Sequence, residues 1–315
     1  MRYKQLMSLV YGSTWAIIPD KLDALCEVMD VLATGDKISD EQIAAATKRR
    51  AGRPKSIEGA VAMLPLSGVI AQHASVVSDS SGGTSTTDFG HAFQDLMADS
   101  RVGAVVIPIH SPGGSVYGLH ELSKIMFDAR GTKPVIAVAD SLAASAAYNL
   151  GTAVDELVVT PGGEVGSIGT IARHVDTSGA ESQSGVVTTI VSKGKHKNDR
   201  SPHEPLTEQA LGDMTEQVER YYDMFVSDVA RNRGVSESSV RNGFGEGRVV
   251  GAVEAVKLGM ADRIDTLDNV VAGLLKRQKR KGTGSRAAAM NRNRVEVMKH
   301  GCGICATRLS THPFD

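Results

Sequence analysis

Ser145 is the residue of this sequence whose surroundings first suggest chemistry. It lies in the stretch SLAASAAYNL at 141–150, shortly after an apolar run that is typical of a buried strand. A serine at a turn from a strand into a helix presents its hydroxyl at the helix N-terminus. The N–H of the next residue, Ala146, is then placed to stabilise an oxyanion. Taken alone, however, this alanine-rich stretch is more typical of a packed helix than of a nucleophile.

A glycine pair follows an earlier buried strand, in HSPGGSV at 110–116. Two glycines allow the backbone to turn sharply and to approach a ligand closely. An exposed N–H in such a turn is a second candidate oxyanion donor. A tight strand-to-helix connection explains the same glycines without any ligand, so this motif leaves both interpretations open.

A serine nucleophile needs a base, and the sequence offers two kinds. Histidine is the usual base, and the candidates are His110, His174 and His196. A lysine can act as a base only if desolvation lowers its pKa from the ordinary value of about 10.4. The lysine candidates follow the β-branched run TTIV and are Lys193, Lys195 and Lys197. Three solvated loop lysines are the simpler interpretation of such a cluster.

Strands and helices alternate along the middle of the chain. We expect strands at 61–70, 102–110, 133–139 and 155–160, and helices at 89–100 and 118–129. A long amphipathic helix is expected at 206–233, because apolar side chains recur there on one face. Alternation at this spacing is typical of an α/β fold with largely parallel sheets.

Composition divides the chain into three parts. Residues 1–55 are expected to form a helical, peripheral extension with a linker, which would serve as a propeptide, a docking arm or an added helical layer. Residues 56–268 carry the α/β pattern and form the expected main domain. Residues 269–315 are basic and poor in core-forming side chains, which predicts a disordered tail.

Charge and hydropathy exclude several classes of protein. The net charge of −1 over 315 residues gives no reason to expect nucleic-acid binding, except through the basic tail. No apolar run approaches the roughly 20 residues that span a bilayer, and the N-terminus lacks a signal-peptide pattern. We therefore expect a soluble protein of the cytoplasm.

The cysteines do not form a disulfide framework, which fits a reducing compartment. Cys26 stands alone, whereas Cys302 and Cys305 form a CGIC motif near His300 and His312. That tail could supply four zinc ligands, but two thiols in a loose tail are the simpler interpretation. No metal site is therefore expected.

Three motifs in this order resemble the signal peptide peptidase A (SppA) family of serine peptidases. They are SPGGSV, LAASAAYNL and GKHKNDRSP, joined by GEVGSIGT between the last two. The resemblance covers about 62–265. It implies a Clp/crotonase-like α/β fold of repeated β-β-α units, and a Ser–Lys dyad that needs no metal or cofactor.

The resemblance assigns a role to each matching position. Ser145 would be the nucleophile and Lys197 the base, with Ser167 orienting the lysine amine. The separations from Ser145, 22 residues to Ser167 and 52 to Lys197, fit single-domain members of the family. The N–H groups of Gly114 and Ala146 would hold the oxyanion. Gly113 and Ser115 would contact the substrate.

The sequence departs from the family pattern in two respects. Ala146 and Ala147 stand where glycines usually follow the nucleophile, which keeps the N–H but implies a tighter pocket. The anchor helix of membrane-bound members is missing. A Ser–His–Asp triad with His174, as in the related Clp subunit, is the alternative, but the serine of GSIGT has a role only with a lysine base.

The resemblance is nearest to the head maturation proteases of tailed bacteriophages. It implies cleavage of scaffold or capsid proteins, and self-cleavage, for which the small-residue stretch at 285–291 is a plausible site. It also implies a homo-oligomer, a ring or dome in which neighbouring subunits sometimes complete the site. The helix at 206–233 could lie at that interface. The alternatives are a cellular peptidase that degrades signal peptides, a non-catalytic assembly protein on the same fold, and a crotonase-type acyl-CoA enzyme.

Overall fold

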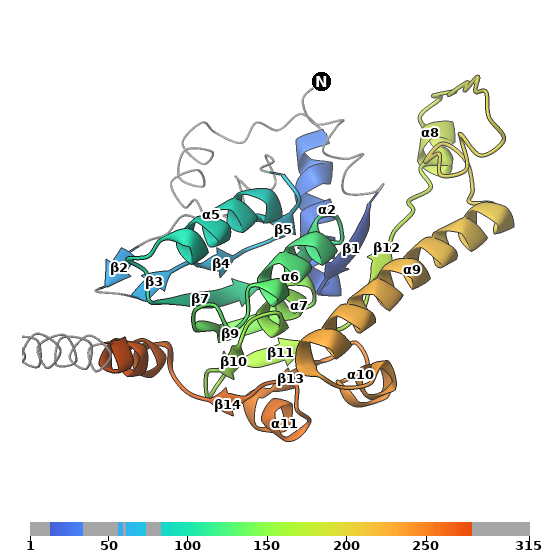
Figure 1. Cartoon of the computed structure of the whole chain (residues 1–315). Coiled ribbons are helices and arrows are strands. Elements are labelled where there is room, and N and C mark those ends of the chain that lie inside the picture. The colour runs from blue at the N-terminus through green and yellow to red at the C-terminus, as the bar shows by residue number, and fades with distance from the viewer. Residues whose placement is uncertain (1–12, 34–55, 59–60, 74–82, 279–315) are drawn as a thin grey trace, which may run out of the picture.

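A largely parallel sheet of nine strands forms the centre of the molecule (Figure 1). The computed structural model describes residues 13–33, 56–58, 61–73 and 83–278. The main path of the sheet runs β13-β11-β9-β7-β3-β2, with β10 and β14 beside β9 and with β4 beside β7. Its strands are β2 (Ser56–Glu58), β3 (Val61–Met63), β4 (Leu66–Ser67), β7 (Ala104–Ser111), β9 (Val135–Ala144), β10 (Glu156–Val159), β11 (Glu164–Gly166), β13 (Val249–Gly251) and β14 (Arg263–Ile264).

A smaller sheet of five strands has the order β12-β1-β8-β5-β6. Its members are β1 (Thr14–Ile17), β5 (Ile70–Ala71), β6 (Thr84–Ser85), β8 (Gly113–Ser115) and β12 (Ile171–Ala172). Two of them continue from segments of the large sheet, because β5 follows β4 after the turn at Gly68 and β8 follows β7 directly. The expected single strand at 61–70 is therefore three short strands, divided at Pro65 and Gly68.

The helices cover both faces of the large sheet. They are α2 (Pro19–Ala33), α5 (Thr86–Ala98), α6 (Leu119–Asp128), α7 (Ala146–Thr152), α8 (Ser178–Gln183), α9 (Glu208–Arg233), α10 (Glu237–Gly243) and α11 (Ala252–Lys257). A further helix occupies 267–278. Side chains of β7 alternate: Val105, Ile107 and Ile109 pack with the helices α5, α6, α7 and α9 on one face, whereas Ala104 and Val106 face the helix at 267–278.

Local sequence explains where the helices begin and end. Ser85 caps α5, since its side chain accepts a hydrogen bond from the Asp88 N–H. Thr207 caps α9 in the same way, and Gly234 closes that helix with a φ of 66°. The predicted α/β class and the long helix at 206–233 are confirmed. The order β7–β8–α6 forms one β-β-α unit, as the resemblance implied.

Two boundary predictions differ from the structure. Within the expected helical, peripheral extension, the described residues before α2 form the buried strand β1, because TWAI is a β-branched and aromatic run that fits a pleated surface. The predicted start of the disordered tail, residue 269, is too early, because residues 267–278 are a helix whose Val270 and Leu274 are buried against the large sheet. Residues 34–55 of the extension, the CGIC motif and the stretch 285–291 lie outside the described residues.

No helix in the described part of the chain is long and apolar enough to cross a bilayer.

Candidate active site

Ser145 occupies the turn between β9 and the helix α7, as predicted. Its backbone has a φ of 53° and a ψ of −120°, a conformation that side-chain-bearing residues rarely adopt. Strain of this kind persists only where the surroundings hold it, and it clusters at functional sites. The Ser145 N–H donates to the Gly166 carbonyl at 2.7 Å. The side chain is buried, and its Oγ has no hydrogen-bond partner among the described residues.

The glycine pair at 113–114 forms strand β8 directly beside Ser145. Gly113 has a φ of +105°, and a Cβ at this position would lie 2.9 Å from the Cβ of Ser145. Gly114 pairs with Ile70, and a Cβ there would lie 2.0 Å from the Ile70 carbonyl oxygen. Only glycine fits at either position, and the absence of side chains lets the β8 backbone run directly beside Ser145. Ser115 completes the strand and is buried.

Ala146 and Ser167 flank Ser145 from two other directions. Ala146 is the first residue of α7, where the N–H has no partner within the helix. Ser167 follows Gly166, the residue whose carbonyl accepts the Ser145 N–H, and it has a φ of 55°. The structure therefore brings Ser145, Ala146, Ser167 and the β8 glycines to one place.

Lys197 lies elsewhere, in a segment that we call the lysine arm, residues 173–206. Figure 1 shows this arm, with α8, standing away from the two sheets beside the N-terminal half of α9. The side chain of Lys197 is exposed, and it has no hydrogen-bond or ion-pair partner among the described residues. The expected dyad is thus not assembled within one chain. Lys193 and Lys195 are exposed on the same arm.

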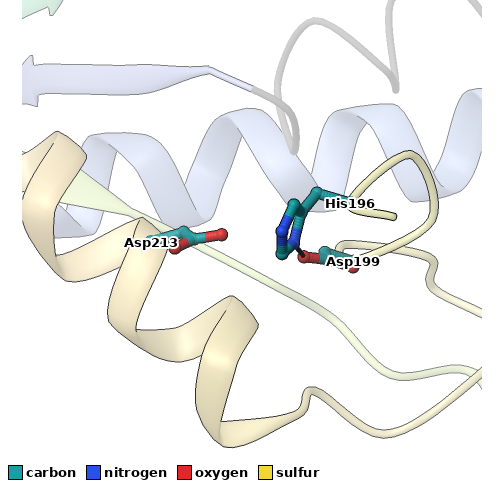
Figure 2. Close-up of side chains that lie close together, drawn as sticks. All are labelled: His196, Asp199 and Asp213. Atoms are coloured by element: carbon teal, nitrogen blue, oxygen red, sulfur yellow. Dashed lines mark hydrogen bonds and ion pairs between the residues drawn. The ribbon is translucent and has the colours of Figure 1, made fainter. Parts of the chain in front are cut away.

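A small polar cluster lies where this part of the arm approaches α9. His196 Nδ1 lies 2.7 Å from an oxygen of Asp199, and both face Asp213 on α9 (Figure 2). Asp213 precedes Asp228 by 15 positions along α9, which corresponds to roughly 20 Å at 1.5 Å per helical residue. Asp228 packs beside α7, so the cluster lies well along α9 from the part of that helix that is next to Ser145.

The same three residues are the one group in the described part of the chain that could hold a metal ion. Their possible ligand atoms lie within 4.8 Å of one another. The cluster is at the surface and does not border Ser145, so it adds nothing to the chemistry of the serine.

None of the candidate histidines contacts the serine hydroxyl, since that oxygen has no partner. His110 Nδ1 lies 3.2 Å from the Asp140 carbonyl oxygen. His174 is half-buried on the lysine arm, and its Nε2 has no partner among the described residues.

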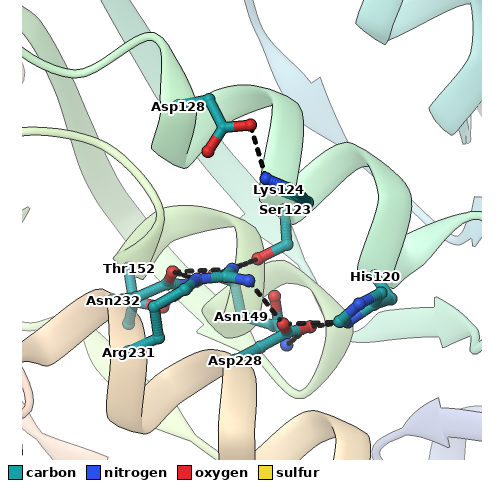
Figure 3. Close-up of polar contacts among 9 residues, drawn as sticks. All are labelled: His120, Ser123, Lys124, Asp128, Asn149, Thr152, Asp228, Arg231 and Asn232. Carbon is teal, nitrogen blue, oxygen red and sulfur yellow. Dashed lines mark hydrogen bonds and ion pairs between the residues drawn. The ribbon is translucent and has the colours of Figure 1, made fainter.

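A buried polar network behind α7 was not predicted from the sequence. Asp228 on α9 is 2 % exposed and lies 2.9 Å from His120 Nδ1, while Asn149 Nδ2 donates to the same carboxylate at 3.4 Å (Figure 3). Burial raises the pKa of Asp228, and the nearby His120 and Arg231 oppose that rise.

A second part of this network lies one turn further along α9. Asn232 Nδ2 donates to Ser123 Oγ and to Thr152 Oγ1, so α9 is fixed to both α6 and α7. The sequence did hold one sign of this network: Asp228 and Asn232, four positions apart, are polar residues on the apolar face of the helix at 206–233. Asn149 lies one turn after Ser145, and its N–H donates to the Ser145 carbonyl. The network therefore holds the helix that begins directly after Ser145.

Comparison with known proteins gives a consistent result. Residues 128–281 match the model of peptidase family S49. The chain is 30 % identical over 255 residues to the head-tail preconnector protein GP5 of Enterobacteria phage P21, covering 78 % of this chain and 50 % of that protein. It is 27 % identical over 215 residues to the capsid assembly protease C of Escherichia phage lambda, covering 68 % and 48 %.

A cellular relative also matches. The putative signal peptide peptidase SppA of Enterococcus faecium is 28 % identical over 185 residues, covering 58 % of this chain and 54 % of that protein. The chain spans about half the length of the curated relatives it matches. Residues 128–281, which carry Ser145, Ser167 and Lys197, therefore match peptidase family S49, and the predicted resemblance to SppA-like peptidases is confirmed.

Proposed function

We propose that this protein is a serine endopeptidase whose nucleophile is Ser145. The observation that carries the proposal is the strained turn at Ser145, where a buried, unpartnered Oγ lies against the glycine strand β8. A packed helix start has no need of a positive φ at a serine or of two glycines that admit no side chain beside it.

In the proposed reaction, the Ser145 oxygen attacks the carbonyl carbon of the scissile peptide bond. The N–H groups of Gly114 and Ala146 stabilise the oxyanion that forms, and loss of one such donor typically costs about 10²–10³-fold in rate. Lys197, oriented by Ser167, takes the serine proton and passes it to the leaving amine. Water then hydrolyses the acyl-enzyme. Gly113 and Ser115 lie where the substrate backbone would pass.

We infer that Lys197 serves the Ser145 of a neighbouring copy of the chain. The support is the position of the lysine arm: its His196 and Asp199 lie beside Asp213, roughly 20 Å along α9 from Asp228, and the arm projects away from the sheets (Figure 1). The arm also exposes apolar side chains: Val187 is 88 % and Val191 is 95 % exposed. Exposed apolar patches of this kind commonly mark protein–protein contacts. A homo-oligomer would cover them and would supply each site with its base.

The proposed substrates are scaffold or capsid proteins of a tailed phage, cleaved in the host cytoplasm during capsid assembly. This setting rests on the similarity to the P21 and lambda proteins, which are named for head-tail connection and capsid assembly. The similarity to a putative signal peptide peptidase favours cellular peptide turnover as the second candidate.

The test compares single alanine variants at Ser145, Lys197, Lys195 and Lys193. Cleavage of an unstructured fluorescent protein and of the phage scaffold protein is measured at equal enzyme concentration. We expect Ser145→Ala and Lys197→Ala each to lower the rate by about 10²-fold or more, the usual contribution of a general base. Lys193→Ala and Lys195→Ala serve as matched controls and should retain activity. Loss of cleavage in Lys195→Ala but not in Lys197→Ala would show that the base is wrongly assigned.

A fluorophosphonate probe adds an independent measurement, because it should label the native chain and not Ser145→Ala. A chain that neither reacts with the probe nor cleaves any added protein would be the non-catalytic assembly protein. Cleavage of signal-peptide fragments but not of scaffold protein would favour the cellular role.

A further inference from the structure

Strand β1 lies between the glycine strand β8 and the strand β12 of the smaller sheet. It runs antiparallel to both, pairing Trp15, Ala16 and Ile17 with the three residues of β8. Peptides commonly bind to proteins by adding an extended strand to a sheet edge. A substrate that is to reach Ser145 along β8 must therefore take the place that residues 14–17 occupy.

The register between β1 and β8 places one carbonyl group opposite the predicted oxyanion donor. The Val116 N–H donates to the Thr14 carbonyl at 3.4 Å, and the Ile18 N–H donates to the Pro112 carbonyl at 3.0 Å. Hydrogen-bonded pairs alternate along an antiparallel ladder. The pair midway between these two is Ala16 with Gly114, so the Gly114 N–H and the Ala16 carbonyl face each other.

The same carbonyl group lies next to the nucleophile. The position that a Cβ at Gly113 would take is 2.3 Å from the Ala16 oxygen, 2.9 Å from the Ser145 Cβ and 3.0 Å from the Ile17 Cα. The peptide bond from Ala16 to Ile17 and the serine side chain therefore meet around one point of the β8 backbone. No other segment of the described chain pairs with β8 on this side.

We propose that the Ala16–Ile17 peptide bond is a processing site and that residues 14–17 are bound as a substrate of the chain's own active site. This inference rests on the proposed peptidase function. It also states a substrate class: an extended segment with a small residue on the acyl side of the scissile bond and bulky apolar neighbours. Ala16 is fully buried, and Trp15 and Ile17 are each 2 % exposed, so the groove encloses all three side chains.

The proposed step follows the chemistry of the peptidase. The Ser145 oxygen forms an ester with the Ala16 carbonyl carbon while the bond to the Ile17 nitrogen breaks. The serine proton passes through the base to that nitrogen, which leaves as an amine. Water then cleaves the ester, giving an Ala16 carboxylate and free Ser145. Because we assign the base to a neighbouring copy, the intact strand is stable in an isolated chain, and cleavage follows assembly.

The test uses the full chain, expressed as wild type and as Ser145→Ala, with intact mass and the N-terminal sequence as readouts. We expect the wild type to lose residues 1–16 and to begin at Ile17, and the Ser145→Ala protein to stay whole. Ala16→Arg should also prevent the cleavage, since an arginine does not fit a fully enclosed position. Asp20→Arg makes a similar change at an exposed position of α2 and should be processed normally.

A fluorescent unstructured protein is added in parallel, so that failure of the inference can be told from failure of the proposed function. If the wild type digests that protein in a Ser145-dependent manner but keeps residues 1–16, the processing site is refuted and the peptidase function stands. If the wild type neither digests the protein nor shortens itself, both are refuted. Loss of residues 1–16 from Ser145→Ala as well would assign the cut to another protease and would refute the inference.

Discussion

Mixing two inactive variants should restore activity, because the structure separates the proposed dyad. Ser145→Ala lacks the nucleophile but keeps the lysine arm, and Lys197→Ala lacks the base but keeps the serine turn. If each site takes its serine from one chain and its lysine from the next, an oligomer formed from both variants contains intact sites. This arrangement follows from a head-to-tail contact between copies.

The expected recovery can be worked out from the geometry. In an equal and random mixture, half of the serine turns and half of the arms are intact, so about one quarter of the sites contain both. Each variant alone should retain about 1 % or less of the wild-type rate, since a general base contributes about 10²–10⁴-fold. Recovery should therefore exceed the background by more than ten-fold.

The assay mixes the two purified variants under conditions that dissociate and reassemble the oligomer, and then measures cleavage of a fluorescent protein. The matched control mixes Ser145→Ala with the double variant Ser145→Ala/Lys197→Ala, which contains no intact serine turn. Recovery in the control would point to contamination. A mixture of the two single variants that reassembles and yet stays as inactive as its parts would refute the shared site, and would require the arm to fold back over its own chain.

Three further predictions concern the surroundings of the site. Gly114→Ala should abolish cleavage and lower the free energy of unfolding by about 1–3 kcal/mol or more, because the new Cβ would lie 2.0 Å from the Ile70 carbonyl oxygen. Denaturant unfolding measures the loss of stability. Gly162→Ala is the control, since a Cβ there meets nothing within 4 Å. Asn232→Ala should cost about 1–3 kcal/mol, because it removes the donor shared by buried oxygens of α6 and α7, and an unchanged denaturation midpoint would contradict this. Hydrogen bonds from Arg101 lower the pKa of Asp99 from its ordinary value of 3.8 to about 2. The ionised Asp99 therefore stabilises the folded chain above pH 3.8, and this contribution is lost as the pH falls through about 2. Asp99→Asn should therefore lower the melting temperature at neutral pH but not near pH 2, and equal shifts at both pH values would argue against the assignment.

Most helices and strands could be predicted, because the sequence patterns that indicate them are local. Alternating apolar side chains in the strands and the amphipathic pattern at 206–233 need no knowledge of the rest of the chain. The serine turn was predicted through the resemblance of the whole set of motifs, because the alanine-rich stretch taken alone is more typical of a packed helix. Its strained φ was not, because that angle depends on Gly166 and Gly113, which come from other parts of the fold.

Features that depend on long-range pairing were missed. The segment TWAI has residues typical of a strand. The amphipathic pattern that follows it, however, led to a prediction that the N-terminal region is helical. Only the pairing with β8 and β12 shows that β1 is part of a sheet. The helix at 267–278 was obscured by the basic residues that follow it. The distance between Ser145 and Lys197 could not be read from their separation of 52 residues, since that number does not reveal which way the arm projects.

The position of the single tryptophan has a consequence for spectroscopy. Trp15 is the one tryptophan of the chain, it belongs to β1, and it is almost completely shielded from water. Emission excited at long wavelength therefore reports on one strand of one groove rather than on the whole fold. A blue emission maximum would indicate that the strand is seated, and a shift toward the red would indicate that it has left. Titration with extended peptides would then measure competition for the groove without any added label.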